Sequence, residues 1–474
     1  MAQTTQPAVA ATTCGVEPEV QRLGFTEKLG YGLGDSASNF FFQFFNIFLL
    51  YYYTDVFGLG AAAVGTMFIV TRIIDAITDP IMGLIADRTR SRWGSFRPYL
   101  LWSAVPYALC GYAMFAGPEL SDSGRLIYAY ATYTAMMLAY TAINVPYSAL
   151  MGVISPSSAD RTEVATYRFM CAFVAAWLIG TFVTPLKNIL GGGDEVQGFR
   201  TTMAIFAVAS VALFWVTFAT TRERVAVERR DQNVRRDLRA LTTNGPWLLL
   251  FVAAVLTLMN AAIRSGALLY YFKYYVGDDG ARIWLIFDKT AVFMSLGLLA
   301  MLLGMSLTSW LCERFEKRNL LIVLTLLNAA AMAVFYVIPP DSYWLMVAVN
   351  CIGTAFMGPT PALVWAMYAD CADYGEWTTG RRTTALVFST LQFGQKLGLA
   401  VGAGLVGLIL GWVGFVANEG QAPATLDGIR ATFSLIPAGL ALLSAAVIIP
   451  YRIDRRMVAQ MEKDLADRHA ATTA

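Results

Sequence analysis

The sequence predicts an all-α membrane protein with twelve transmembrane helices arranged as two six-helix bundles. Its composition, the spacing of its apolar stretches and the asymmetry of its basic residues support this prediction. Of the 474 residues, 57% are hydrophobic and only 14% are charged, and the mean hydropathy is +0.54. A soluble globular domain usually carries about 25% charged residues. The chain is therefore expected to lie in a lipid bilayer.

Apolar stretches, separated by charged or glycine- and proline-rich turns, give the twelve helices. They fall at residues 31–55, 60–86, 98–117, 126–153, 166–190, 201–220, 246–276, 283–311, 319–338, 342–369, 385–413 and 429–451. The connections from even- to odd-numbered stretches hold seventeen Lys and Arg, whereas the others hold five. Because basic loops stay in the cytoplasm, both termini are expected there and the protein in the cell inner membrane. The net charge of +2 thus reflects topology rather than a nucleic-acid partner.

The two ends of the chain are expected to be cytoplasmic tails. Residues 1–26 lack the basic start and apolar core of a signal peptide, so we expect a disordered tail there, and residues 452–474 form the second one. The six cysteines show no CxxC spacing, so neither disulfides nor a zinc site are expected. The only histidine, His469, lies in the second tail, which excludes histidine as a proton carrier within the membrane.

The longest polar interruption, residues 221–245, predicts a linker between one bundle at 27–220 and another at 246–451. Two loops of the first half are echoed in the second: GLIADRTRSRWGSFR by LCERFEKRN, and SADRTEVATYR by ADYGEWTTGRR. Short cytoplasmic loops are all basic, which would explain one such pair, but two pairs at similar offsets favour duplication. Internal repeats of this kind are typical of transporters, whose ligand site lies between the repeats near the membrane midplane.

Asp75 and Asp79 are the most informative pair of residues in the chain. They lie four residues apart inside an apolar stretch, so helical geometry puts both carboxylates on one face. Each charge costs at least about 2–3 kcal/mol in hydrocarbon unless a cation or water receives it. A cation site is the first hypothesis. The alternative is a structural ion pair with Arg72, but one arginine cannot neutralise two carboxylates.

Polar residues at helical spacing mark further helix faces. They are Asp35, Asn39, Gln43 and Asn46; Thr134, Thr141, Asn144 and Ser148; Asn260 and Arg264; and Ser389, Gln392 and Lys396. Lipid cannot satisfy such groups, so the faces are expected to line a wet pathway for a hydrophilic ligand. A single face of this kind could equally make hydrogen bonds between helices. Flanking aromatic residues, Trp365 and Tyr140 among them, are suited to stacking on sugars but also fill ordinary membrane cores.

Several runs resemble the glycoside-pentoside-hexuronide:cation symporters, a branch of the major facilitator superfamily. The runs are KLGYGLGDSASN, YYYTDVFGLGAAAVGTMF, RIIDAITDPIMGLIADRTRSRWGSFRPY, INVPYSAL and DYGEW. The likeness extends from about residue 27 to 451 and is greatest to the xyloside and isoprimeverose type. It implies the major facilitator fold and a carrier that imports a glycoside with Na+ or H+ by alternating access.

The resemblance also implies roles for individual residues. The implied cation site consists of Asp75, Asp79, Thr78 and Thr141, where Thr78 replaces an asparagine of melibiose permease. Asn39 and Asn144 align with the two galactoside-binding aspartates of that permease. Together with the polar faces, the likeness gives an expected substrate site of Asp35, Asn39, Tyr140, Asn144, Ser148, Arg168, Arg264, Trp365 and Lys396. Ser38, Ser148 and Pro361 replace a lysine and two tryptophans, so a melibiose carrier is not expected.

We expect the cargo to be a glycoside or oligosaccharide of pentoside or glucoside type. The alternatives are a hexuronide, or a non-sugar amphiphile such as a lysolipid or drug. No enzymatic activity, catalytic residue, metal site or cofactor is expected beyond the coupling ion, Na+ or H+. The expected partners are the glycoside, a monovalent cation and the bilayer, and the protein is expected to be a monomer. Arg92, Arg97 and Arg382 are expected to act in gating, unless these arginines only set topology.

Overall fold

The protein is described here from a computed structural model that covers residues 23–155, 157–224, 244–278, 280–379 and 384–473. Within these ranges the regular structure is helical, and the only β-type pairing is an isolated bridge between Trp284 and Phe287. Ten of the described helices are long and apolar enough to cross a membrane, and Ala104–Met114 is a shorter apolar one. The predicted all-α membrane fold is therefore confirmed.

Helices occur at all twelve predicted positions. The first six are α1 (Phe25–Phe44) with the π-helical turns η1 (Phe45–Leu49) and η2 (Tyr52–Val56), α2 (Ala61–Arg88), α3 (Arg97–Trp102) with α4 (Ala104–Met114), α5 (Asp122–Val153), α6 (Ser158–Gly191) and α7 (Glu195–Thr220). The last six are α9 (Gly245–Tyr270) with η3 (Tyr271–Val276), α10 (Lys289–Ser306) with α11 (Thr308–Arg314), α12 (Lys317–Val334), α13 (Tyr343–Met357) with α14 (Thr360–Thr379), α15 (Thr384–Trp412), and α16 (Pro423–Phe433) with α17 (Leu435–Ile448). A final helix, α18 (Arg455–Thr473), follows them.

Several boundaries differ from the predicted ones. The first span begins at Phe25 instead of residue 31, because polar residues of its first turns still have partners: Glu27 accepts from Arg224 at 2.6 Å, and Lys28 pairs with Glu163 of α6. The eighth begins at Lys289 instead of residue 283, since the Asp288 carboxylate caps the helix by accepting a hydrogen bond from the Ala291 amide at 2.8 Å. The last begins at Pro423, a residue type that suits the first turn of a helix.

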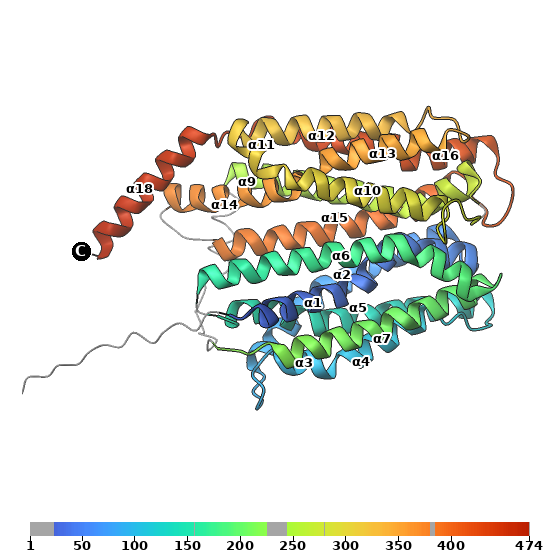
Figure 1. Cartoon of the computed structure of the whole chain (residues 1–474), viewed down its shortest axis with the longest axis horizontal. Coiled ribbons are helices and arrows are strands. Elements are labelled where there is room, and N and C mark those ends of the chain that lie inside the picture. The colour runs from blue at the N-terminus through green and yellow to red at the C-terminus, as the bar shows by residue number, and fades with distance from the viewer. Residues whose placement is uncertain (1–22, 156, 225–243, 279, 380–383, 474) are drawn as a thin grey trace, which may run out of the picture.

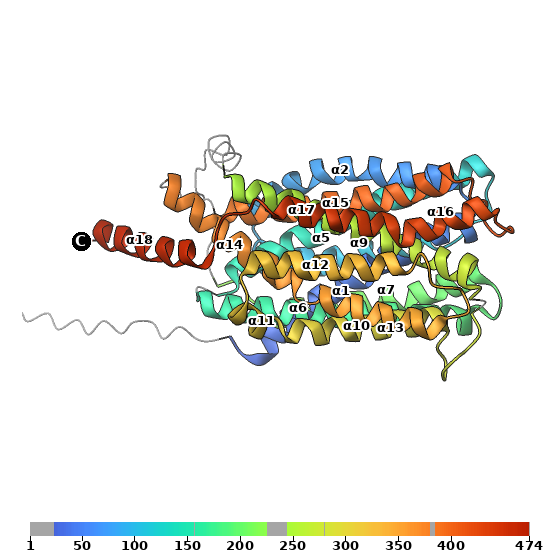
Figure 2. The ribbon, with the colours of Figure 1, turned by 90° about the horizontal axis from the view of Figure 1, so that it is seen from above.

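The helices α1–α7 and α9–α17 lie in two lobes, here named the first and second halves (Figure 1). Seen from above, α2 and α15 run side by side along the molecule (Figure 2), and they make extensive contact. The C-terminal helix α18 projects from one end of the bundle, and the opposite end is here named the distal end. Most of the predicted linker, residues 225–243, lies outside the described residues.

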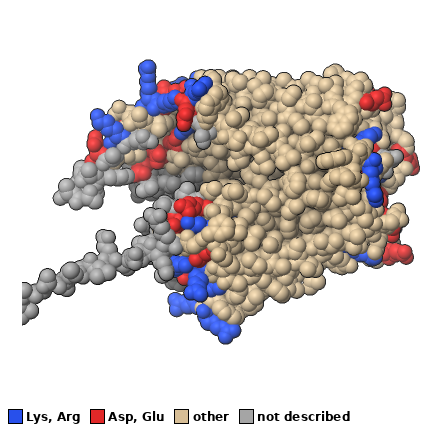
Figure 3. Space-filling view, viewed as in Figure 1, with Lys and Arg blue, Asp and Glu red and all other residues tan. Residues whose placement is uncertain are grey.

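The visible face of the molecule has the charge distribution of a membrane protein. Charged side chains gather at the two ends, and the broad region between them shows few (Figure 3). Large apolar side chains such as Val208, Leu303 and Ile127 are about 70% exposed, as lipid-facing residues would be.

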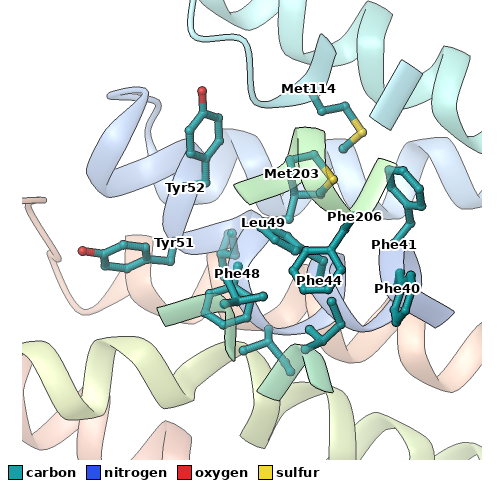
Figure 4. Packing of buried hydrophobic residues seen from close by; sticks show 14 of the residues in the cluster. Phe40, Phe41, Phe44, Phe48, Leu49, Tyr51, Tyr52, Met114, Met203 and Phe206 are labelled. Carbon is teal, nitrogen blue, oxygen red and sulfur yellow. The ribbon is translucent and has the colours of Figure 1, made fainter. Parts of the chain in front are cut away.

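Aromatic packing makes the distal part of the first half rigid. Phe41, Phe44 and Phe48 lie on one side of α1 and η1, are almost completely buried, and pack with Phe206 and Met203 of α7 (Figure 4). Interlocked rings of this kind resist rearrangement because each fills the space left by its neighbours. The π-helical turns that follow α1 are thus attached to a firm base.

Glycines bring α2 and α15 into direct backbone contact across the two halves. A Cβ atom on Gly65 would lie 2.5 Å from the Gly404 carbonyl oxygen, and one on Gly407 would lie 2.4 Å from that of Ala61. Only glycine fits such a crossing, as is common in membrane helix pairs. We name this contact the α2–α15 seam.

Candidate functional site

The acidic pair of α2 faces a hydroxyl group on α5. Thr141 Oγ1 lies 2.9 Å from Asp75 Oδ1 and 2.9 Å from Asp79 Oδ1, and Asp75 is only 3% exposed. A threonine hydroxyl carries one proton and can donate it to only one of these oxygens. The second contact then joins two acceptors, which is unfavourable unless a proton or a metal cation lies between them. The geometry therefore suits a site for a small cation.

Two basic side chains reach the same carboxylates. Lys396 of α15 is paired with Asp79, its Nζ lies 3.8 Å from Asp75 Oδ2, and Arg72 lies 3.4 Å from that same oxygen. Two negative charges therefore meet two positive ones. An incoming ion must compete with the Lys396 ammonium, which occupies the side of the pair that faces the second half.

Lys396 also ties the halves together at this point, because Asp79 belongs to α2 and Lys396 to α15. Lys396 is one of the expected substrate-binding residues, and the structure places its ammonium on the acidic pair. Thr78, expected in the cation site, donates its hydroxyl to the Asp75 backbone carbonyl at 3.2 Å. That hydrogen bond stays within α2.

A second ion pair lies within the first half. Arg168 Nε of α6 donates to Asp35 Oδ1 of α1 at 3.1 Å, and the Arg168 guanidinium lies 5.3 Å from the centre of the Tyr147 ring. Asn39 Nδ2 donates to the backbone oxygen of Asp35 at 2.9 Å and lies 3.3 Å from its carboxylate. The structure thus brings three of the expected substrate residues, Asp35, Asn39 and Arg168, together, and they form hydrogen bonds with one another.

The expected residues of α5 lie nearby. Ser38 Oγ donates to Asn144 Oδ1 at 2.8 Å, while Asn144 Nδ2 is buried without a described partner. Tyr140 stacks on Phe42 with ring centres 6.5 Å apart. Ser148 follows Asn144 by one helical turn. The unpaired amide hydrogen of Asn144 is an available donor, which is costly to bury without a ligand or water.

A cavity of about 340 Å³ lies between the halves. Its polar lining comes from both of them: Asn39 and Gln43 of α1, Asn260 and Arg264 of α9, Asn328 of α12 and Asn350 of α13. Asn260 is 4% exposed, and its Oδ1 has no described donor. Five amides and a guanidinium around one space can donate to and accept from several hydroxyl groups at once. We name this space the central cavity.

Arg264 is the charged group of the central cavity. Its Nη1 donates to the Phe433 carbonyl at 3.2 Å and its Nη2 to Asn350 Oδ1 at 3.3 Å. The guanidinium also lies 4.7 Å and 4.4 Å from the ring centres of Phe335 and Phe433. Among the described residues, no carboxylate pairs with it. Its positive charge is therefore held by neutral groups alone.

A second, more apolar cavity of about 480 Å³ adjoins the first and shares Asn260, Phe173, Asn328 and Met357 with it. Trp365, another expected substrate residue, lines this second cavity, and its ring contacts that of Phe169 edge to face at 6.0 Å. The expected substrate residues are therefore spread over four places: the surroundings of the Asp35–Arg168 ion pair, the central cavity, the second cavity and the acidic pair.

The expected gating arginines make contacts inside the first half. Arg97 Nη2 donates to the Phe218 carbonyl at 2.6 Å, and the Arg92 guanidinium lies 4.2 Å from the centre of the Trp93 ring. Arg382 lies outside the described residues.

Sequence reasoning missed Asn328 and Asn350. Asn328 lies in the apolar part of α12 with only Thr325 one turn before it, and Asn350 is the one amide of α13 with only Thr354 one turn after it, so neither forms a long polar face. An amide in the apolar part of a membrane span is nevertheless itself a signal.

The chain matches the family model described as MFS/sugar transport protein over residues 30–455. It belongs to this family. The Escherichia coli (strain K12) inner membrane symporter YicJ is 37% identical, over 90% of this chain and 92% of that protein. The putative glycoside/cation symporter YagG of the same organism is 35% identical, over 95% and 96%. The isoprimeverose transporter of Lactiplantibacillus pentosus is 32% identical, over 95% and 93%.

A crystal structure of the nucleoside transporter NupG matches the fold with a TM-score of 0.61 and 14% identity, over 90% of this chain and all of that one. At this identity the match supports the fold alone.

Proposed function

We propose that this member of the family is a secondary active symporter that imports a glycoside or oligosaccharide together with Na+ or H+. The observation that carries the proposal is the acidic pair Asp75 and Asp79, bridged by Thr141 and placed between α2 and α15. The names of the relatives YagG and the isoprimeverose transporter agree with a cation and a sugar as the two substrates.

The coupling between ion binding and the movement of the two halves is proposed to depend on the charges of Asp79 and Lys396. In the structure Lys396 neutralises Asp79 and joins the halves. An ion that takes the place of the ammonium frees α15 to move relative to α2 while the carboxylates remain neutralised. The coupling ion thereby lowers the cost of the rearrangement. By linkage, sugar then raises the affinity for the ion by the same factor as the ion raises the affinity for sugar.

Either coupling ion agrees with the geometry. A proton on one carboxyl group would give Thr141 a donor on one side and an acceptor on the other. A Na+ ion would instead bind the carboxylate and hydroxyl oxygens together. The oxygen-rich composition of the pair is compatible with both.

A neutral pentoside or glucoside is our first choice of cargo. The amides around the central cavity, with the orphaned Asn260 Oδ1 among them, match the mixed donors and acceptors of sugar hydroxyls. A hexuronide is the second candidate, because the Arg264 guanidinium in the same cavity is held only by neutral groups. A carboxylate on the sugar would give it a charged partner.

We further propose that both termini are cytoplasmic, that the protein lies in the cell inner membrane and that it acts as a monomer. The excess of Lys and Arg in alternate loops supports the orientation. The distal end then lies on the side of the membrane away from the cytoplasm, here called the external side.

The test is uptake of radiolabelled glycosides into membrane vesicles under an imposed Na+ gradient, an imposed pH gradient, or neither. Accumulation that depends on one gradient supports symport and identifies the ion. Uptake that reaches only equilibrium under both gradients would refute coupling. A panel of unlabelled competitors then separates the cargoes, since inhibition by glucuronides but not by xylosides or glucosides would overturn the neutral-sugar choice.

A further inference from the structure

The distal ends of α1 and α9 carry the same short pattern. Residues 51–58 read YYYTDVFG and residues 270–277 read YYFKYYVG. Both segments form π-helical turns, η2 and η3, and the glycine that follows each has a positive φ, +80° at Gly58 and +70° at Gly277. π-Helical turns are rare and are often found at functional sites. Equivalent helices of the two halves therefore end in equivalent, unusual structures.

These two segments contact each other across the halves. Asp55 lies in η2, and its carboxylate accepts hydrogen bonds from Lys273 Nζ at 2.8 Å and from the Tyr274 hydroxyl, both of which lie in η3. Next to this contact, the hydroxyl groups of Thr54, which directly precedes Asp55, and Tyr270 are 2.6 Å apart. Asp55 has no exposed carboxylate surface, whereas the Lys273 side chain is 28% exposed. Solvent therefore reaches the lysine of this ion pair but not its carboxylate.

A loop of the second half covers this contact. Asn418, in the connection between α15 and α16, donates from Nδ2 to the Asp55 carbonyl at 2.6 Å and accepts from Lys273 Nζ at 2.7 Å. The backbone N–H of Asn418 donates to the Tyr274 hydroxyl at 2.8 Å. Asn418 has a φ of +60°, a conformation that costs most residues energy but that asparagine tolerates. One loop residue is thus held in a specific shape by both halves.

On the first half, aromatic packing around Tyr51 supports this contact. Tyr51, which precedes η2, packs with Phe199 and Tyr270, and its hydroxyl accepts a hydrogen bond from Lys273 at 3.2 Å. It adjoins the aromatic cluster of α1 and α7 (Figure 4). The well-packed η2 turn of the first half thus contacts η3 and the α15–α16 loop of the second half, and this contact holds the two halves together at the distal end.

We infer that Asp55 is the first-half residue of an external gate, and that the gate is closed when Lys273, Tyr274 and the loop residue Asn418 of the second half bind to it. Within η2, Thr54 Oγ1 donates to the Asp55 carboxylate at 2.8 Å. The other groups that face Asp55 come from η3 and from the loop after α15, so the gate closes only when the two halves meet at the distal end. When the halves separate, water solvates Asp55 and Lys273, and the gate opens without leaving a buried charge. The inference rests on the proposed function for the orientation and for the alternation of the two halves.

The gate can be tested by labelling a cysteine in the central cavity from each side of the membrane. The reporter is Gln43→Cys in the full-length protein with its native cysteines replaced by serine, treated with a membrane-impermeant maleimide. Right-side-out vesicles report opening toward the outside and inside-out vesicles opening toward the cytoplasm. Labelling needs neither sugar nor coupling ion, so failure of the gate and failure of symport are separately visible.

Three substitutions weaken the gate in different ways. Asp55→Asn removes the charge, Lys273→Gln removes its partner, and Asn418→Gly removes the amide while glycine keeps the left-handed backbone at no cost. Each is expected to raise the external labelling rate about fivefold to thirtyfold. The reason is that each removes a hydrogen bond to a charged group, and such a loss shifts the equilibrium between the closed and open gate by about this factor. Cytoplasmic labelling is expected to stay equal or fall.

Gln421→Ala is the matched control. Gln421 lies in the same loop, and its amide nitrogen donates only to the loop carbonyls of Val416 and Glu419. It should leave external labelling unchanged. Unchanged external labelling in all three gate variants would overturn the inference. So would a rise from both sides of the membrane, which indicates a loosened protein, or an equal effect of Gln421→Ala, which indicates that only the loop's shape matters.

Discussion

Removal of the Lys396 charge should tighten binding of the coupling ion. In the structure the ammonium is paired with Asp79 and lies 3.8 Å from Asp75 Oδ2. At an effective dielectric constant of about 20, a pair of unit charges at this distance attracts by about 4 kcal/mol. The Lys396 side chain is 38% exposed, so water screens part of this energy. About 1–2 kcal/mol is a reasonable remainder, which corresponds to a roughly 5- to 30-fold change in affinity.

The assay is a titration of the purified protein with the ion that drives uptake, followed by calorimetry or by intrinsic tryptophan fluorescence. For Na+, the Kd of Lys396→Gln should fall by that factor. For H+, the pH at which sugar affinity is half-maximal should rise by about one unit. Lys317→Gln is the control, since Lys317 pairs with Asp370 at 2.7 Å within the second half. An unchanged or weakened ion affinity in Lys396→Gln, with sugar binding intact, would refute the competition between Lys396 and the ion.

Three further predictions follow from the same structure. Asp79→Asn should abolish accumulation of sugar against a gradient while sparing equilibrium exchange, and a mutant that still accumulates sugar would remove Asp79 from the ion site. Arg264→Met should weaken binding of an acidic sugar at least about tenfold but that of a neutral sugar much less, as measured by competition in vesicles; equal losses would mean that Arg264 does not recognise charge. Asp288→Asn should raise the melting temperature at pH 7.5, because burial raises the pKa of Asp288 from 3.8 to about 6. The folded protein then binds the proton more tightly, so stability falls as pH rises from about 4 to about 6, and the gain of roughly 1–3 kcal/mol should vanish below about pH 4; a gain that persists at low pH would contradict this cause.

The fold could be predicted from the sequence because membrane spans are specified by local composition. Each apolar stretch must form a helix to satisfy its own backbone in lipid, whatever its neighbours are. The boundaries were less predictable where capping decides them. Asp288 reads as a polar residue inside an apolar stretch, yet its carboxylate starts α10.

The candidate site was predictable in its parts but not in their assembly. The i,i+4 spacing brings Asp75 and Asp79 to one face of α2 from sequence alone, and Thr141 meets them as the resemblance implied. Lys396 lies 317 residues after Asp79, and only the packing of α15 on α2 brings the two together. Asn350 is isolated in its helix, and its position beside Arg264 likewise depends on tertiary packing.

The positions of the ion site and the gate suggest how one acts on the other. Both lie where the halves touch: Lys396 and Asp79 join α15 to α2, and the glycine contact of the α2–α15 seam lies farther along the same two helices. The gate loop continues from the end of α15, so α15 carries Lys396, the seam glycines and, through the loop, Asn418. In the proposed mechanism, opening the distal end separates α15 from α2 and breaks the Lys396–Asp79 pair that joins these two helices. Without an ion, that step leaves Asp79 without its partner in a low-dielectric region, whereas a bound cation replaces the lost charge. In the proposed symport the ion thus offsets an electrostatic cost of opening, while the proposed gate residues, which are solvated as they part, set how far the closed state is favoured.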